Sequence, residues 1–226
     1  MKGFGVPGKK RKFSNQKSNF SAEKLISKAF EFHKQGNIEE AEKYYLICLE
    51  KGLTNYKVLA NYGAICQQTG RSDKAIKMYH KSIELFPNNP ILYSNLGGLQ
   101  KNKGNLKEAR IFLLKAIKIK PDFADAHSNL GTILRDLGKL EEAESSTLKA
   151  IRLKPDFADA HSNLGTILRG LGKLEEAELS TRKAIKLKPD FADAHLNLGT
   201  ILRDLGKLEE AELSTRKAIE LKPDFA

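Results

Sequence analysis

The chain has 226 residues, 40% of them hydrophobic and 30% charged, which is enough apolar content to bury a core. Its longest uninterrupted apolar run, Tyr44–Leu49, is far shorter than the roughly 20 residues of a membrane-spanning helix. Residues 1–20 hold no apolar stretch of signal-peptide length. Cys48 and Cys66 have neither the number nor the spacing of a disulfide framework or a CxxC site. We therefore expect a reduced, cytoplasmic protein that does not cross a membrane.

The formal net charge of +11 is unevenly distributed along the chain. Residues 1–20 carry six bases and no acid, residues 21–123 are mildly basic, and residues 124–226 are slightly acidic. A charge distribution of this kind attracts acidic partners without recognising them specifically.

Internal repetition is the strongest feature of the sequence. The segments 124–157, 158–191 and 192–225 align without gaps, and consecutive segments differ at only four and three of their 34 positions. The same register continues toward the N-terminus through more divergent segments. The six units are 22–55, 56–89, 90–123, 124–157, 158–191 and 192–225. Residues 1–21 precede the units, and we expect them to form a basic, disordered head.

The sequence pattern of each unit predicts two helices. In the unit 124–157, apolar and small residues between Ala126 and Leu134 recur at spacings of three and four, so they share one helix face. Gly138 follows at unit position 15, where every unit has a glycine suited to the left-handed residue that closes a helix. The second helix begins with acids, ends with bases and stops before Pro155. Gly131, in the middle of the first helix, predicts a close approach of the second helix. Because such hairpins cannot bury their apolar faces alone, they must stack on neighbours.

The unit resembles the tetratricopeptide repeat, whose pattern is W-x2-L-G-x2-Y…A-x3-F…P. Leu130-Gly131, Ala143 and Pro155 fit this pattern, whereas His127 replaces the tryptophan and Thr147 replaces the bulky residue after the alanine. The resemblance implies an all-α fold, a right-handed superhelical α-solenoid of six helix-turn-helix repeats.

Asparagine recurs at unit position 6 although it is a poor former of helix interiors. The five residues are Asn61, Asn95, Asn129, Asn163 and Asn197. The string Ser-Asn-Leu-Gly after Asp-Ala-His is similar to the repeats of protein O-linked N-acetylglucosamine transferases. That resemblance implies a concave groove in which an asparagine ladder holds the backbone of an extended peptide, since an amide matches a peptide unit bidentately. In the alternative interpretation, the amides bridge to the neighbouring repeat and hold the stack.

Three further rows should line the implied groove beside the ladder, at unit positions 2, 9 and 12. They are Asp125, Asp159 and Asp193; Thr132, Thr166 and Thr200; and Arg135, Arg169 and Arg203. This groove is polar and nearly balanced in charge, which suits a peptide better than a phosphate group. The lysine and asparagine residues with which some arrays of the family clamp a C-terminal carboxylate are absent from positions 5 and 9.

The remaining motifs do not predict a cofactor-binding, metal-binding or catalytic site. Gly3–Gly8 reads GxGxxG but lacks the flanking strand, the helix and the later acid of a dinucleotide site. His127, His161 and His195 stand one repeat apart, which is too far for shared zinc ligation, so we interpret them as packing residues. We find no nucleophile with a neighbouring base. The sequence therefore predicts a protein that is not an enzyme, binds no cofactor or metal, and acts as a scaffold for a protein or extended peptide.

Two alternatives remain. Bacterial arrays of similar sequence, with a similar Met-Lys-Gly-Phe-Gly start, often precede a glycosyl-, sulfo- or methyltransferase domain, so the chain could be the targeting part of a transferase whose catalytic domain lies outside it. A nucleic-acid contact through the basic head is not favoured, because few aromatic residues interleave with its charges. At the other end, Ile219, Leu221 and Phe225 keep the internal apolar pattern. We expect these three to be partly exposed where their equivalents in the preceding unit are covered, so that this edge frays or pairs with a second copy or a downstream domain.

Overall fold

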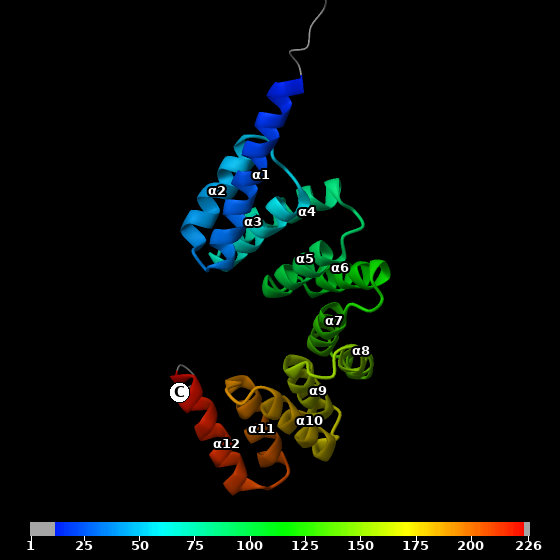
Figure 1. Cartoon of the computed structure of the whole chain (residues 1–226). Helices are drawn as coiled ribbons and strands as arrows, with labels where there is room; N and C mark the ends of the chain where they lie inside the picture. Colours follow the sequence, from blue (N-terminus) through cyan, green and yellow to red (C-terminus); the bar gives the residue numbers. More distant parts are fainter. Residues whose placement is uncertain (1–11, 224–226) are drawn as a thin grey trace, which may run out of the picture. The chain divides into compact units, whose positions relative to one another are not determined.

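The computed structural model describes the backbone of residues 12–223 and the side chains of residues 22–223 (Figure 1). This part of the chain contains twelve helices and no strand. The helices are α1 Lys12–Lys34, α2 Ile38–Glu50, α3 Tyr56–Gln68, α4 Ser72–Leu85, α5 Pro90–Asn102, α6 Leu106–Ile119, α7 Ala124–Asp136, α8 Leu140–Leu153, α9 Ala158–Gly170, α10 Leu174–Leu187, α11 Ala192–Asp204 and α12 Leu208–Leu221. Two consecutive helices fall in each 34-residue unit of the sequence, so the predicted helix-turn-helix repeat is confirmed.

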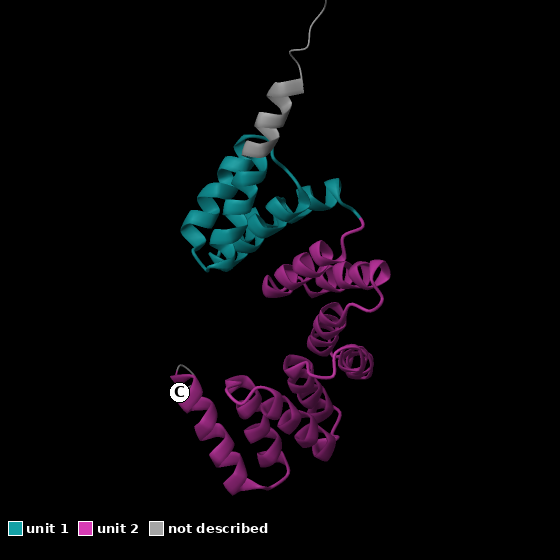
Figure 2. Cartoon of the chain, in the orientation of Figure 1, with its two compact units in different colours: residues 1–87 teal, residues 88–226 magenta. Residues whose placement is uncertain are grey.

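The chain divides into two compact units, residues 1–87 and 88–226, which Figure 2 shows in different colours. In the second unit, α5/α6, α7/α8, α9/α10 and α11/α12 pair as hairpins. The second helix of each hairpin also packs against the first helix of the next hairpin. The first helices α5, α7, α9 and α11 contact one another in sequence and so form one continuous face. In the first unit, α1/α2 and α3/α4 form the two hairpins, and α2 packs on α3.

The turn inside each hairpin is built on the glycine at unit position 15. Gly138 has a φ of 75°, in the left-handed region that glycine adopts without strain. Its N–H donates to the Arg135 carbonyl, and the N–H of Lys139 donates to the Leu134 carbonyl at 2.8 Å, which closes α7 in the manner of a Schellman motif. The other five units have a glycine with φ between 75° and 80° at this place, so the predicted role of this glycine is confirmed.

A glycine in the middle of the first helix marks a close approach within the hairpin in five of the six units, from Gly63 in α3 to Gly199 in α11. A Cβ atom added to Gly131 would lie 2.1 Å from Oγ1 of Thr147, and one added to Gly165 would lie 2.0 Å from Oγ1 of Thr181. In the divergent units a larger side chain takes the threonine's place, as where Tyr79 packs over Gly63. The predicted close approach is therefore confirmed, and it explains why these units tolerate a glycine inside a helix.

In the second compact unit, buried clusters join one hairpin to the next. Leu164 and Leu168 of α9 pack with Ala177 of α10 and with Ile201 of the next hairpin, all of them buried. Each hairpin thus completes the core of the one before it, as expected of a solenoid.

Helix α1 begins at Lys12, ten residues before the first repeat unit. Its residues 12–21 belong to the head that the sequence analysis expected to be disordered. All glycines and the proline of the head lie at positions 3–8, so its second half contains no helix-breaking residue. Residues 1–11 lie outside the described part of the chain.

Candidate functional site

The residues predicted to line a groove share one face of the first helices. On α7, Asp125, Asn129, Thr132 and Arg135 stand at intervals of four, three and three residues, which places them in one stripe. The same stripe recurs on α9 and α11. Because these helices pack side by side, the stripes form rows across the second compact unit. Asn61 lies on α3 of the first compact unit, apart from the four-residue ladder of the second.

The asparagine amides fall into two groups. Asn129 is exposed and Asn95 and Asn163 are half-buried, and none of these three side chains has a hydrogen-bond partner among residues 22–223. In contrast, Nδ2 of Asn197 donates to Oγ of Ser162 on the preceding repeat at 3.2 Å. The Asn61 amide faces the Tyr45 hydroxyl of the preceding repeat and acts to lower its pKa. A hydrogen-bonded bridge between repeats is therefore made by Asn197, and three consecutive amides are available to a ligand.

The threonine row is less open than the sequence suggests. The hydroxyl of Thr132 donates to the Ser128 carbonyl at 3.2 Å, and Thr132 is buried. Thr166 and Thr200 make the same bond to the carbonyl four residues earlier and are half-buried. With their protons used inside the helix, these hydroxyls offer a ligand only an acceptor.

The two charged rows differ in how far their charges are compensated. Arg135 pairs with Asp136 at 2.7 Å, and Arg169 pairs with Asp204 of the next repeat at 2.5 Å. Arg203 also lies 3.8 Å from Asp204. The aspartates at position 2 are exposed and have no ion-pair partner in the described part of the chain. They are Asp125, Asp159 and Asp193. The uncompensated charge along this face is therefore negative.

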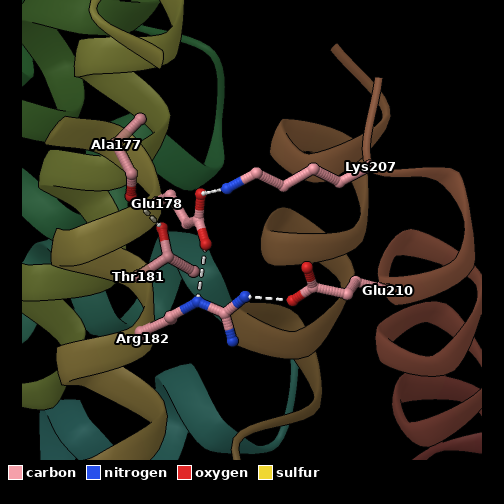
Figure 3. A network of polar contacts seen from close by, with 6 residues as sticks. All are labelled: Ala177, Glu178, Thr181, Arg182, Lys207 and Glu210. Carbon is pink, nitrogen blue, oxygen red and sulfur yellow. Dashed lines mark hydrogen bonds and ion pairs between the residues drawn. The ribbon is translucent and has the colours of Figure 1, made fainter. Parts of the chain in front are cut away.

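A set of ion pairs between repeats escaped the sequence analysis (Figure 3). Glu178 of α10 accepts from Lys207 at 2.7 Å and from Arg182 at 2.8 Å. Arg182 in turn pairs with Glu210 of the next hairpin at 2.6 Å. The hydrogen bond from Lys207, followed by that from Arg182, holds the pKa of Glu178 below its ordinary value. The sequence signal is an acid at unit position 21 and a base at position 16 of the next unit. The pairs Glu144–Lys173 and Glu42–Arg71 share it.

The surroundings of the histidines and cysteines indicate structural roles for these residues. Nε2 of His127 lies 2.9 Å from the Pro121 carbonyl oxygen, and its N–H donates to that oxygen. The ring therefore fastens the loop between repeats. His161 and His195 make the same hydrogen bond in their units. Among the described residues there is no cluster of three or more metal-ligating side chains. Cys48 and Cys66 are buried, and burial raises the pKa of both thiols.

Stacked helical hairpins with a polar row along their first helices define a repeat protein of the α-solenoid class. Family models described as "Tetratricopeptide repeat" match residues 24–51, 67–130, 158–191 and 192–225, and one described as "TPR repeat" matches residues 131–172. The chain belongs to the tetratricopeptide repeat family.

Several solved structures share this fold. The crystal structure of MamA is 27% identical with a TM-score of 0.60, over 72% of this chain and 95% of that one. YrrB, described as a TPR protein with an unusual peptide-binding site, is 24% identical with a TM-score of 0.59, over 80% and 93%. PilF of Pseudomonas aeruginosa is 18% identical with a TM-score of 0.77, over 91% and 93%. No curated protein matches the chain.

The fold and the family together support a scaffold for protein–protein interaction. No helix in the described range is long and apolar enough to cross a membrane. The bacterial origin, the cytoplasmic location, the lack of catalytic activity and the likeness to O-linked N-acetylglucosamine transferase repeats stay predictions from the sequence.

Proposed function

We propose that the chain is an interaction scaffold whose second compact unit binds an extended peptide across α5, α7, α9 and α11. The observation that carries the proposal is the run of three unpartnered amides at Asn95, Asn129 and Asn163. Asparagine inside a helix is about 0.6 kcal/mol less favourable than alanine, and these side chains make no hydrogen bond within the described residues that would offset this cost. A ligand that uses them gives their recurrence a physical reason.

The chemistry of the amides suits a peptide backbone. Each amide offers two donors and an acceptor, so it can pair with both the N–H and the C=O of one peptide unit. Packed helices lie about 8–10 Å apart, which is about three residues of an extended polyproline II chain; this chain rises about 3.1 Å per residue and points every third side chain the same way. Successive asparagines would therefore bind every third residue. At Asn197 the bridge to Ser162 uses one donor and leaves the second donor and the acceptor for a ligand.

The charges of the face favour basic ligands. Asp125, Asp159 and Asp193 are one repeat apart and lack internal partners, whereas the arginine row is compensated by Asp136 and Asp204. We therefore propose that the preferred peptide carries Lys or Arg at every third position.

The test is to replace Asn129 and Asn163 together with alanine. Fluorescence anisotropy is measured with labelled extended peptides that carry Lys, Glu or Ser at every third position. The Lys peptide should bind best, and the double variant should bind it about tenfold more weakly, which corresponds to about 1.4 kcal/mol. The matched control is Asn102→Ala, at the exposed end of α5 and outside the ladder.

Circular dichroism distinguishes the two roles of the amides. The double variant should keep the helicity of the parent and melt at the same or a slightly higher temperature, because alanine is the better helix former. If melting falls while peptide binding holds, the amides serve the stack, and the proposal is wrong. The alternative of a targeting region for a transferase has no structural observation of its own and stays a prediction from the sequence.

A further inference from the structure

A shallow cavity of about 400 Å³ lies between α11 and α12, on the outer face of the hairpin that these two helices form. Thr200, Leu208 and Ile219 line it together with two charged residues of α12, Glu212 and Arg216. No ladder asparagine lines this cavity, although Thr200 and Arg203 of the predicted rows do, and no role has been assigned above to its α12 side.

The repeats show what such a face binds, because the equivalent face of the preceding hairpin is occupied. There, α10 is covered by the following hairpin, whose Lys207 and Glu210 hold Glu178 and Arg182 (Figure 3). Each of these two α10 charges thus has one partner in its own helix and one in the next hairpin.

Among the described residues, the corresponding charges of α12 pair only with each other. Nη2 of Arg216 lies 2.6 Å from Oε1 of Glu212, as in the pair within α10. The side chain of Glu212 is 63% exposed, whereas that of Glu178 is 13% exposed. Because the second partner is missing, each α12 charge has hydrogen-bonding capacity that its counterpart on α10 uses to hold a hairpin.

The apolar part of the face is open in the same way. Ile219 is 36% exposed, whereas its counterpart Ile185 packs against the buried cluster of the next hairpin. The predicted exposure is confirmed for Ile219. Leu221 is half-buried, as is Leu187 one repeat earlier, so the predicted difference between these two leucines is not seen, and Phe225 lies outside the described residues.

One residue of this face differs from the residue at the same position of the preceding hairpin. Leu196, 36% exposed, lines the cavity where the preceding repeat has Ser162, the acceptor of the Asn197 amide. An incoming helix with asparagine at that place would lose this hydrogen bond and bury its amide against a leucine. The face therefore fits an apolar residue there.

We propose that the α11–α12 face binds a helical hairpin of a partner protein built like this repeat. The hairpin would have a base just before its second helix, an acid three residues later, and an apolar residue in place of the ladder asparagine. The first hairpin of a second copy fits less well, because Asn37 stands where the base is needed.

The probe is a labelled synthetic peptide with the sequence of residues 192–225 and leucine in place of asparagine at its position 197, added to the unlabelled chain. It should bind and gain helicity on binding. Glu212→Lys in the chain should weaken binding about fivefold to tenfold, and a second probe with Lys207→Glu should restore it. Arg216→Glu with a Glu210→Lys probe repeats the cycle at the other charge. Glu209→Lys, an exposed acid of the same helix that does not line the cavity, is the matched control and should leave binding unchanged.

Three outcomes would overturn the proposal. The first is the absence of binding at millimolar probe, and the second is binding that Glu212→Lys leaves unchanged. The third is self-association of the chain alone that Glu212→Lys abolishes, which would make a second copy the occupant. Circular dichroism of Glu212→Lys should match the parent because this side chain is mostly exposed.

Discussion

Replacing Gly165 with alanine tests the close contact between the two helices of a repeat. In an unconstrained helix, alanine is about 1 kcal/mol more favourable than glycine. Here the new Cβ would lie 2.0 Å from Oγ1 of Thr181 and 3.1 Å from the Ala177 carbonyl. The hydroxyl cannot stay, yet it is buried and donates to that carbonyl at 2.8 Å. Overpacking costs about 1–3 kcal/mol, and loss of a buried hydrogen bond costs about 1 kcal/mol more. The net expectation is a loss of about 1–3 kcal/mol in the free energy of unfolding.

Urea unfolding followed by circular dichroism measures this loss, and a double-mutant cycle assigns it. Thr181→Ala removes Oγ1, so Gly165→Ala should cost little or even stabilise the chain in that background. The matched control is Gly170→Ala at the end of the same helix, where the new Cβ meets only the tip of the Leu140 side chain, at 3.2 Å. That variant should be neutral or slightly stabilising. A Gly165→Ala chain as stable as the parent, with additive effects in the cycle, would refute the reasoning.

Two further predictions concern pH. The hydrogen bonds from Lys207 and Arg182 lower the pKa of Glu178. The stability that ionised Glu178 contributes is therefore complete above the ordinary glutamate pKa and is lost as pH falls through the lowered value. Glu178→Gln should cost about 1 kcal/mol of unfolding free energy at neutral pH and little in acid, and an equal cost for the more exposed Glu212→Gln would contradict this. Burial raises the pKa of Tyr45 to about 12, so its neutral phenol stabilises the fold fully below about pH 10, and about 2–3 kcal/mol is lost as pH rises through about 12. Absorbance of tyrosinate should show a late-ionising group that Tyr45→Phe removes, and an unchanged titration in that variant would exclude the assignment.

The hairpin architecture could be predicted from the sequence because its determinants are local and repeated six times. Gly138 closes a helix through its own φ angle, and Gly131 marks a contact inside one hairpin. Helix α1 begins at Lys12, within the predicted head, where no glycine or proline follows residue 8.

The candidate site was less predictable because it depends on contacts between repeats. Asn163 and Asn197 each follow a repeat with serine at position 5, yet only Asn197 donates to that serine. Residue type therefore does not decide whether a ladder amide is free. Compensation of the arginine row also depends on stacking, since Arg169 pairs with Asp204 of the next hairpin. The repeat that Arg135 faces has Gly170 instead, so Arg135 pairs with its own neighbour Asp136.

In the second compact unit each hairpin packs only on the hairpins next to it in the chain. Stability then comes from each hairpin and its contacts with its nearest neighbours, and within the described part of this unit no extensive contact between distant hairpins would force all of them to unfold together. Partly unfolded chains that have lost hairpins from one end should be populated during melting, with a calorimetric enthalpy larger than the van't Hoff value. A substitution in α11 will then report mainly on the last hairpin, and the same substitution in α7 on a larger block. Identical changes placed in different repeats would therefore measure how far cooperativity extends along the array.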